Sequence, residues 1–200
     1  MTNRIAADAA GIARAAQVLR AGGVIAFATD TVWGIGALAS CPPALARIFA
    51  IKGRADTRPV ACLVRDAAMA RALSDRWDAQ VEAIARRHWP GALTIVVPAA
   101  GRFPAAQRGL ATLGLRVPDR PAVLALLDDL REPLAATSAN LSGQPELPDA
   151  GAVHAALGAH VDLVLDDASP VSGLASTVVE WNTTAWRVLR PGAVQLDSED

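Results

Sequence analysis

Short apolar runs rich in β-branched residues alternate along the chain with alanine-rich stretches, a pattern typical of an α/β fold. Asp8 can cap a helix that ends before Gly22-Gly23, and Pro42-Pro43 can open another. Such boundary signals predict helices over residues 9–21, 42–51, 66–73, 78–88, 121–130 and 149–157. The apolar runs predict strands over residues 24–28, 60–64, 93–97, 113–117, 134–136, 161–165, 177–181 and 186–189.

These elements predict one α/β domain built on a mixed sheet. The last two strands are joined too briefly for a parallel crossover, so they should pair antiparallel, whereas most earlier strands are separated by helices. The pattern shows no internal repeat, no low-complexity tract and no second domain. We expect a single domain over residues 1–200, with its core at about residues 8–192 and a tail at 193–200.

Composition excludes several classes of protein. Of the 200 residues 52% are hydrophobic, which is enough for one sizeable core. No apolar run reaches about 18 residues, and Met1 to Asp8 lack a basic segment followed by an apolar one, so neither a membrane span nor a signal peptide is predicted. Cys41 and Cys62 form no C-x-x-C pair, which argues against structural zinc. We therefore expect a cytoplasmic protein without a metal site built by its own side chains.

The formal net charge of −1 conceals an asymmetry along the chain. Residues 1–120 carry 16 Lys and Arg against 8 Asp and Glu, whereas residues 121–200 carry 3 against 12. Solvated helix faces can account for part of this difference, but a positive field in the first part also suits an anionic ligand. A nearly neutral chain does not favour non-specific binding of nucleic acid; a local basic groove stays open.

Lys52 is the only lysine among 19 basic residues, and it lies in Ile51-Lys52-Gly53-Arg54-Ala55-Asp56-Thr57-Arg58-Pro59. Lysine binds a phosphate as a point charge, whereas arginine clamps it with a planar fork, so the two cations are not interchangeable. A compositional bias that left one lysine by chance is the alternative. Three cations within seven residues, next to a glycine that permits close backbone approach, favour a polyanion site.

Two polar segments directly follow predicted strands, where ligands of open α/β sheets usually bind. One is Ala28-Thr29-Asp30-Thr31-Val32-Trp33-Gly34-Ile35-Gly36, and the other is Thr137-Ser138-Ala139-Asn140-Leu141-Ser142-Gly143, a candidate nest for phosphate oxygens. Either could instead be an ordinary turn whose side chains bond their own backbone. The spacing of the glycines does not fit a dinucleotide-binding turn, and no G-x-S-x-G or Walker lysine motif is present.

Arg116 is the third candidate, because it lies inside the apolar strand Leu115-Arg116-Val117-Pro118. A guanidinium buried there needs a carboxylate or a phosphate as its partner. Ser176 and Arg190 similarly lie at the ends of the last two apolar strands.

In this order, the polar segments resemble the YrdC/TsaC family of L-threonylcarbamoyladenylate synthases, of the short type with one domain. The resemblance covers about residues 20–192, and Lys-x-Arg followed much later by Ser-x-Asn is its characteristic pairing. The resembling stretches are residues 29–36, Lys52-Gly53-Arg54, Trp89-Pro90-Gly91-Ala92-Leu93-Thr94, Leu115-Arg116-Val117-Pro118, residues 138–143, Ser176-Thr177-Val178-Val179 and Leu189-Arg190-Pro191-Gly192.

The resemblance implies a twisted open mixed sheet with flanking helices around a basic concave cavity. It implies the conversion of L-threonine, bicarbonate and ATP to threonylcarbamoyl-AMP and pyrophosphate, with Mg²⁺, and a downstream transferase that modifies tRNA. Carried over by position, the threonine-binding residues are Thr31, Arg116, Ala136 and Ser176. The ATP-binding residues are Lys52, Arg54, Arg58, Thr112, Ser138, Asn140, Glu146 and Arg190, and the catalytic set is Lys52, Arg54, Ser138 and Asn140.

The residue chemistry agrees with these roles. An arginine fork suits the carboxylate of threonine, and hydroxyl groups such as Thr31 and Ser176 suit its side chain. No residue must serve as a covalent nucleophile, so we expect catalysis by positioning and by fixed charges. The family commonly has Glu and Tyr where this chain has Asp30 and Trp33, which leaves the roles of these two residues open. A relative that binds RNA without synthase activity, and one that handles carbamoyl phosphate, remain alternatives.

Overall fold

One ten-stranded sheet organises the computed structural model, which describes residues 3–53, 60–141 and 143–197. Its strands are β1 (Arg4–Ala6), β2 (Ile25–Ala28), β3 (Trp33–Leu38), β4 (Ala61–Leu63), β5 (Leu93–Pro98), β6 (Thr112–Arg116), β7 (Leu134–Ser138), β8 (Leu163–Asp166), β9 (Thr177–Trp181) and β10 (Trp186–Arg190). The helices are α1 (Ala9–Arg20), α2 (Pro42–Ile51), α3 (Ala67–Arg71), α4 (Ala79–His88), α5 (Pro104–Gln107), α6 (Pro121–Leu130) and α7 (Ala150–Leu157).

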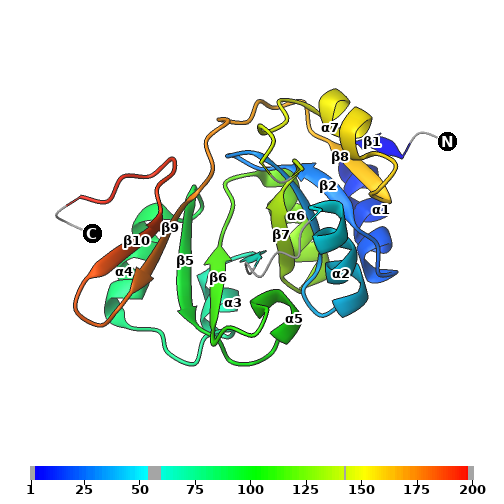
Figure 1. The fold of residues 1–200 in the computed structure, drawn as a ribbon. Coiled ribbons are helices and arrows are strands. Elements are labelled where there is room, and N and C mark those ends of the chain that lie inside the picture. Colours follow the sequence, from blue (N-terminus) through cyan, green and yellow to red (C-terminus); the bar gives the residue numbers. More distant parts are fainter. Residues whose placement is uncertain (1–2, 54–59, 142, 198–200) are drawn as a thin grey trace.

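The sheet is mixed, as the sequence predicts. Its strand order is β1-β8-β2-β3-β7-β4-β6-β5-β9-β10, and Figure 1 shows it running from β10 on one side of the molecule to β1 on the other. Strand β8 pairs in parallel with both β1 and β2, and the pairs β4/β6 and β5/β9 are also parallel. The remaining neighbours are antiparallel, including the last pair, β9 and β10.

Helix α1 illustrates how local signals fix the helix boundaries. The Asp8 carboxylate accepts a hydrogen bond of 2.8 Å from the backbone N–H of Gly11, and so satisfies one of the free donors at the helix start. Past the C-cap residue Ala21, Gly22 takes a positive φ of 80°, which stops the helix at little steric cost. Asp66 and Asp149 cap α3 and α7 in the same way.

Two buried clusters lie on opposite faces of the sheet. Helices α1 and α6 pack on one face with Leu19, Leu126 and Leu127 fully buried, whereas α2, α4 and α7 contribute to the other cluster. Burying one such leucine contributes roughly 1.5–3 kcal/mol of hydrophobic free energy. Figure 1 shows α1, α2, α6 and α7 gathered at the half of the sheet that contains β1, β8, β2 and β7. Part of the α1/α6 face therefore remains without a helix.

Strands β5, β6 and β9 form this part. On β5, Leu93, Ile95 and Val97 are buried in the cluster of the opposite face, whereas Thr94 and Val96 line a cavity. The same alternation recurs along β6 and β9, because neighbouring side chains of a strand point to opposite faces. One face of these three strands thus lines one hollow. The polar residues on this face are Thr94, Thr112, Arg116 and Glu180.

Part of the polar segment 28–36 is a strand that the sequence did not predict, because Trp33–Leu38 is strand β3. All six residues are buried, and two of them are glycines. A Cβ at Gly36 would lie 3.0 Å from the ring of Phe27 and 3.1 Å from the Ala135 carbonyl oxygen, so glycine is favoured here by close packing and not by a turn. The sequence also failed to indicate the short elements β1 and α5.

The sheet is strongly curled. β2 and β6 are separated by four inter-strand steps, or roughly 19 Å along a sheet with strands about 4.8 Å apart. Nevertheless the Arg116 side chain, at the end of β6, bonds directly to Asp30, which follows β2. The connector of residues 167–176 spans seven such steps, roughly 34 Å, from β8 to β9. Ten extended residues reach at most about 36 Å, and this connector bends. It therefore takes the direct path between β8 and β9, like a chord across the curved sheet, and does not follow the sheet (Figure 1).

Neither outer strand of the sheet is a long, regular strand. β1 is only three residues long, and β10 carries a bulge where its register to β9 shifts between Val188 and Arg190. After β10 the chain returns to the sheet, because the Val194 carbonyl oxygen accepts a hydrogen bond of 2.6 Å from Thr177 Oγ1. Among the described residues, no helix has the length and apolar character needed to cross a membrane.

Candidate active site

A cavity of about 520 Å³ lies on the face of the sheet that α1 and α6 leave uncovered. Strands β2 to β7, β9 and β10 contribute to its lining, together with loop residues such as Thr31, Glu146 and Ser176. The predicted site residues that line it are Thr31, Thr112, Arg116, Ala136, Ser138, Glu146, Ser176 and Arg190. Residues more than 100 positions apart in the sequence therefore share one hollow.

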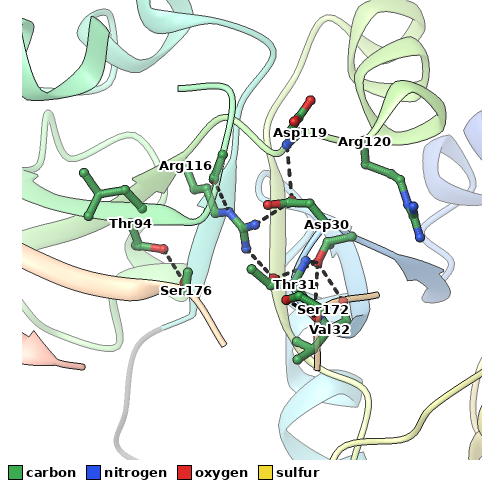
Figure 2. Close-up of polar contacts among 12 residues, drawn as sticks. Asp30, Thr31, Val32, Thr94, Arg116, Asp119, Arg120, Ser172 and Ser176 are labelled. Carbon is green, nitrogen blue, oxygen red and sulfur yellow. Dashed lines mark hydrogen bonds and ion pairs between the residues drawn. The ribbon is translucent and has the colours of Figure 1, made fainter. Parts of the chain in front are cut away.

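Arg116 is buried and uses three groups of the chain to fix its guanidinium (Figure 2). Its Nε donates to the Gly91 carbonyl oxygen at 2.8 Å, Nη1 to Thr31 Oγ1 at 2.8 Å, and Nη2 to Asp30 Oδ1 at 2.6 Å. A guanidinium carries five N–H donors, so two remain for a ligand. Asp30 supplies the carboxylate that a buried arginine requires.

Burial lowers the pKa of Arg116 below its ordinary value, while the charge and the hydrogen bond of Asp30 act in the opposite direction. The backbone N–H of Asp119 also donates to Asp30 Oδ1, at 3.2 Å. Arg116 therefore presents an oriented cation whose charge is largely balanced by a neighbouring carboxylate.

The turn that carries Asp30 and Thr31 is organised by the buried hydroxyl of Thr29. Thr29 Oγ1 lies 2.9 Å from Thr31 Oγ1, donates to the Val32 carbonyl oxygen at 2.7 Å, and accepts from the backbone N–H groups of Thr31 and Val32 at 3.2 Å. These bonds hold the Thr31 hydroxyl against Arg116. Thr29 acts on the site through Thr31, a role that sequence reasoning did not identify.

Ser176 lies on the opposite wall and pairs with Thr94. Their hydroxyl oxygens are 2.8 Å apart, and both residues are buried (Figure 2). Arg190 Nη2 donates to the Ser176 carbonyl oxygen at 2.7 Å and to its hydroxyl at 3.1 Å. Sequence reasoning also missed Thr94, although its place among buried apolar neighbours of β5 was a usable signal. Asp30, Thr31, Thr94, Arg116 and Ser176 are called the Arg116 cluster below.

Lys52 is the C-cap residue of α2, and its side chain contacts the Ser138–Asn140 turn, which the family resemblance pairs with it. The ammonium donates to the carbonyl oxygen of Ser138 at 2.8 Å, to Asn140 Oδ1 at 2.8 Å and to the carbonyl oxygen of Asn140. Ser138 Oγ donates to Asn140 Oδ1 at 2.6 Å. Ser138 lines the cavity, whereas Lys52 and Asn140 support it without lining it. The buried ammonium thus places a positive charge beneath the turn.

Glu146 and Arg190 complete the polar groups beside this turn. Burial raises the pKa of Glu146, while Lys52, the Ser138 hydroxyl and Arg190 act in the opposite direction. Its buried Oε2 accepts no hydrogen bond from any described residue. Burial lowers the pKa of Arg190, and Glu146 opposes this effect. Lys52, Ser138, Asn140, Glu146 and Arg190 are called the Lys52 cluster below, and Arg190 joins it to Ser176 of the Arg116 cluster.

Two predicted ATP-binding residues, Arg54 and Arg58, lie outside the described residues, as does Ser142. Among the described lining residues, Arg116, Arg187 and Arg190 are cationic, and Glu146 and Glu180 are anionic. Arg187 and Glu180 form an ion pair of 2.6 Å. The basic character of the cavity therefore remains a prediction. No cluster of His, Cys, Asp and Glu suited to a metal ion occurs in the described part of the chain.

Comparison with known proteins gives concordant matches in sequence. A family model named for Sua5, YciO and YrdC, and described as "Telomere recombination", matches residues 17–192. The chain is 34% identical over 196 residues to the threonylcarbamoyl-AMP synthase of Bacillus subtilis (strain 168). This match covers 97% of the chain but 57% of the relative.

Solved structures agree. The structure of P. abyssi Sua5 complexed with L-threonine matches with a TM-score of 0.88 at 31% identity, over 94% of this chain and 56% of that one. E. coli YciO matches with a TM-score of 0.86 at 26% identity, over 96% of this chain and 95% of that one. The chain therefore spans little more than half the length of the B. subtilis and P. abyssi relatives, and nearly all of YciO.

Proposed function

Because the chain belongs to the Sua5/YciO/YrdC family, we propose that it is an L-threonylcarbamoyladenylate synthase. It would form threonylcarbamoyl-AMP and pyrophosphate from L-threonine, bicarbonate and ATP. The observation that carries the proposal is the convergence of the Arg116 and Lys52 clusters on one cavity of about 520 Å³. The named activity of the B. subtilis relative and the L-threonine bound to P. abyssi Sua5 support this assignment.

The Arg116 cluster suits L-threonine. The two remaining N–H donors of Arg116 can bind the carboxylate, and the hydroxyls of Thr31 and Ser176 can bond the substrate hydroxyl. Removing that hydroxyl would leave buried polar groups without a partner, so an analogue without it should be rejected strongly. Against serine only the methyl group of threonine is available, on a wall that includes Ala136, and such a contact contributes roughly 1–3 kcal/mol.

The Lys52 cluster suits the triphosphate of ATP. Ser138, Glu146 and Arg190 line the cavity there, and Lys52 and Asn140 hold the Ser138 turn from behind. Thr112 on β6, and Arg54 and Arg58 beyond the described residues, are also assigned to ATP. Mg²⁺ would enter with ATP as part of the substrate. The partnerless Oε2 of Glu146 is a hard oxygen donor of the kind that Mg²⁺ prefers, so the residues present fit a phosphate-bound ion.

The proposed reaction needs no covalent intermediate with the protein. The amine of threonine combines with bicarbonate to give a carbamate and water. A carbamate oxygen then attacks the α-phosphorus of ATP, the bond from that phosphorus to the bridging oxygen breaks, and pyrophosphate leaves. Negative charge develops on phosphoryl oxygens, which fixed cations such as Lys52 and Arg190 would stabilise. Positioning the carbamate against the α-phosphorus supplies the rest.

The product is an activated acyl-type adduct, so a separate transferase should consume it for the N6-threonylcarbamoyl modification of adenosine in tRNA. We propose accordingly that the protein acts in the cytoplasm, where it would encounter that enzyme. Direct contact with tRNA is not required by this assignment. RNA binding without synthase activity is not favoured, because the groups that line the cavity suit an amino acid and an anion.

The direct test is incubation with ATP, Mg²⁺, L-threonine and labelled bicarbonate, followed by separation of adenylates. We expect a labelled adenylate together with pyrophosphate, and neither without threonine. Tight binding of tRNA with no labelled adenylate, under conditions where the B. subtilis enzyme is active, would refute the assignment in favour of the RNA-binding alternative. Labelling that depends on carbamoyl phosphate in place of threonine would refute it in favour of the relative that handles carbamoyl phosphate.

A further inference from the structure

Arg120 is a second buried arginine near the cavity, but it does not line it. It directly precedes α6 and lies one residue after Asp119, whose N–H bonds Asp30 (Figure 2). Its side chain is directed to the connector of residues 167–176, the chord across the curled sheet. Nothing in the proposed chemistry uses this guanidinium, so its burial needs another explanation.

The guanidinium holds the first half of the connector at three points. Its Nε forms an ion pair of 3.1 Å with Asp167 Oδ2, although this N–H is not aligned for a hydrogen bond. Nη2 donates to the Ser169 carbonyl oxygen at 2.7 Å, and Nη1 to that of Pro170 at 3.4 Å. Asp167 Oδ1 accepts from the backbone N–H of Ser169 at 2.9 Å, which closes the loop on itself. A planar fork with several donors is suited to such a set of acceptors.

The second half of the connector lies on the turn of the Arg116 cluster. The Ser172 N–H donates to the Asp30 carbonyl oxygen at 3.2 Å, and the Gly173 N–H to that of Thr31 at 2.8 Å. Ser172 Oγ donates to the same Thr31 oxygen at 3.2 Å (Figure 2). Gly173 has a positive φ of 77°, which favours glycine at this point.

Along its length the connector therefore contacts first Arg120 and then the backbone of Asp30 and Thr31. It ends at Ser176 on the opposite cavity wall. Asp119 and Arg120 fix the same turn twice, once through the Asp119 N–H on the Asp30 carboxylate and once through Arg120 and the connector. A short chain under these restraints has little freedom to shift Ser176 relative to Thr31.

We infer that Arg120 is a positioning residue for the amino-acid half of the cavity: it anchors the connector, and thereby sets the spacing of the Thr31 and Ser176 hydroxyls. The inference rests on the proposed function in assigning L-threonine to these hydroxyls. It differs from a purely stabilising role, because loss of the anchor should affect threonine more than ATP. The Lys52 cluster makes no described contact with Arg120.

The kinetic test compares Arg120→Ala, Arg120→Lys and the control Arg47→Ala, which removes an exposed ion pair with Asp162. We expect Arg120→Ala to raise the KM for L-threonine by about three- to tenfold, with a smaller change in the KM for ATP. Arg120→Lys should restore part of the loss, because an ammonium can pair with Asp167 but cannot reach all three acceptors as a fork. The control should match the wild type. Equal increases in both KM values, or no increase in either, would overturn the inference.

A second measurement does not depend on activity. Hydrogen exchange should show the amides of Ser172 and Gly173 protected in the wild type, and exchange at least about tenfold faster in Arg120→Ala, with α1 unchanged. If Arg120→Ala does not fold, Asp167→Asn keeps the shape and removes the ion pair, and should give a smaller change of the same kind. Unchanged protection of these two amides would refute the anchor even if the protein is a synthase. Faster exchange in a protein without synthase activity would instead contradict only the proposed function.

Discussion

The Arg116 and Lys52 clusters each contain a buried cation, but the groups that bond it differ. Arg116 is matched by a carboxylate, Asp30, at 2.6 Å, and its orientation is fixed by three bonds. The Lys52 ammonium is held by uncharged oxygens of Ser138 and Asn140, and Glu146 beside it has a raised pKa. The first arrangement suits a zwitterion, whose carboxylate needs an oriented but nearly neutral partner. The second places a cation directly behind the Ser138 turn, on the side of the cavity proposed for the polyanion.

Replacing Arg116 should have the largest effect on activity, because it removes the cation of one of the two clusters. Arg116→Ala leaves the partly buried Asp30 carboxylate without its cationic partner and removes the fork proposed to bind the substrate carboxylate. We expect kcat/KM for L-threonine to fall on the order of 10²- to 10³-fold, measured by adenylate formation. Arg116→Lys should retain the charge but recover little, because it lacks the fork. Thermal unfolding should be measured in parallel, and a folded variant with nearly normal use of threonine would contradict the role.

Lys52→Ala tests the other cluster and should have the next largest effect. Loss of the ammonium removes bonds that hold the Ser138 turn and removes charge near the proposed phosphate site, so we expect kcat to fall by roughly 10²-fold with little change in the KM for threonine. Pyrophosphate release is the measurement, and the exposed Arg131→Ala is the matched control. Nearly wild-type release by a folded Lys52→Ala protein would show that the assignment is wrong.

Thr29→Val sharpens the claim that the Arg116 cluster is preorganised. Valine has nearly the same shape as threonine but cannot bond Thr31 and Val32, so the turn should loosen while the core remains filled. We expect the KM for threonine to rise by about three- to tenfold, with kcat at saturation changed less. Thr184→Val, in the exposed β9–β10 hairpin, is the control. An unchanged KM for threonine would show that Thr31 does not depend on this hydroxyl.

The smallest effect concerns Glu146 and the dependence of stability on pH. Because burial raises its pKa, the folded protein keeps a proton there that the unfolded chain has released. This contribution to stability is present at low pH and is lost as the pH rises through the folded-state pKa. Glu146→Gln cannot ionise, so its free energy of unfolding relative to wild type should increase with pH above the ordinary value of 4.5. Denaturant titrations without ATP measure this difference; the opposite trend would mean that nearby cations dominate.

Sequence reasoning predicted most of the fold, because its signals were local. Asp8, Asp66 and Asp149 each begin a helix at a capping position, and the predicted apolar runs all contain strands. Strand β3 was missed because its two glycines resemble a turn, whereas Gly36 allows close contact with Phe27 and with the Ala135 carbonyl oxygen of β7. This close contact is tertiary and leaves no periodic signal in the sequence.

Local sequence signals predicted only part of the candidate site. The need of Arg116 for a carboxylate follows from its apolar strand, but the identity of that carboxylate depends on the curl that brings β6 to the end of β2. Thr29 and Thr94 lie in stretches that carry the resemblance, but their roles, like that of Arg120, depend on bonds to residues distant in the sequence or on the fold of the turn. Their roles become visible only with the connector and the sheet in place.

The bulge in β10 has a further consequence for how the protein behaves at high concentration. An outer strand with free backbone groups is a template for edge-to-edge pairing between molecules, and so for aggregation. In β10 the register shift between Val188 and Arg190 interrupts the regular row of donors and acceptors, and arginines flank the two exposed apolar residues, Val188 and Leu189. Arg190 thus belongs both to the cavity and to a strand that is poorly suited to pairing with a neighbouring molecule, and its loss should promote self-association as well as weaken the proposed binding of ATP.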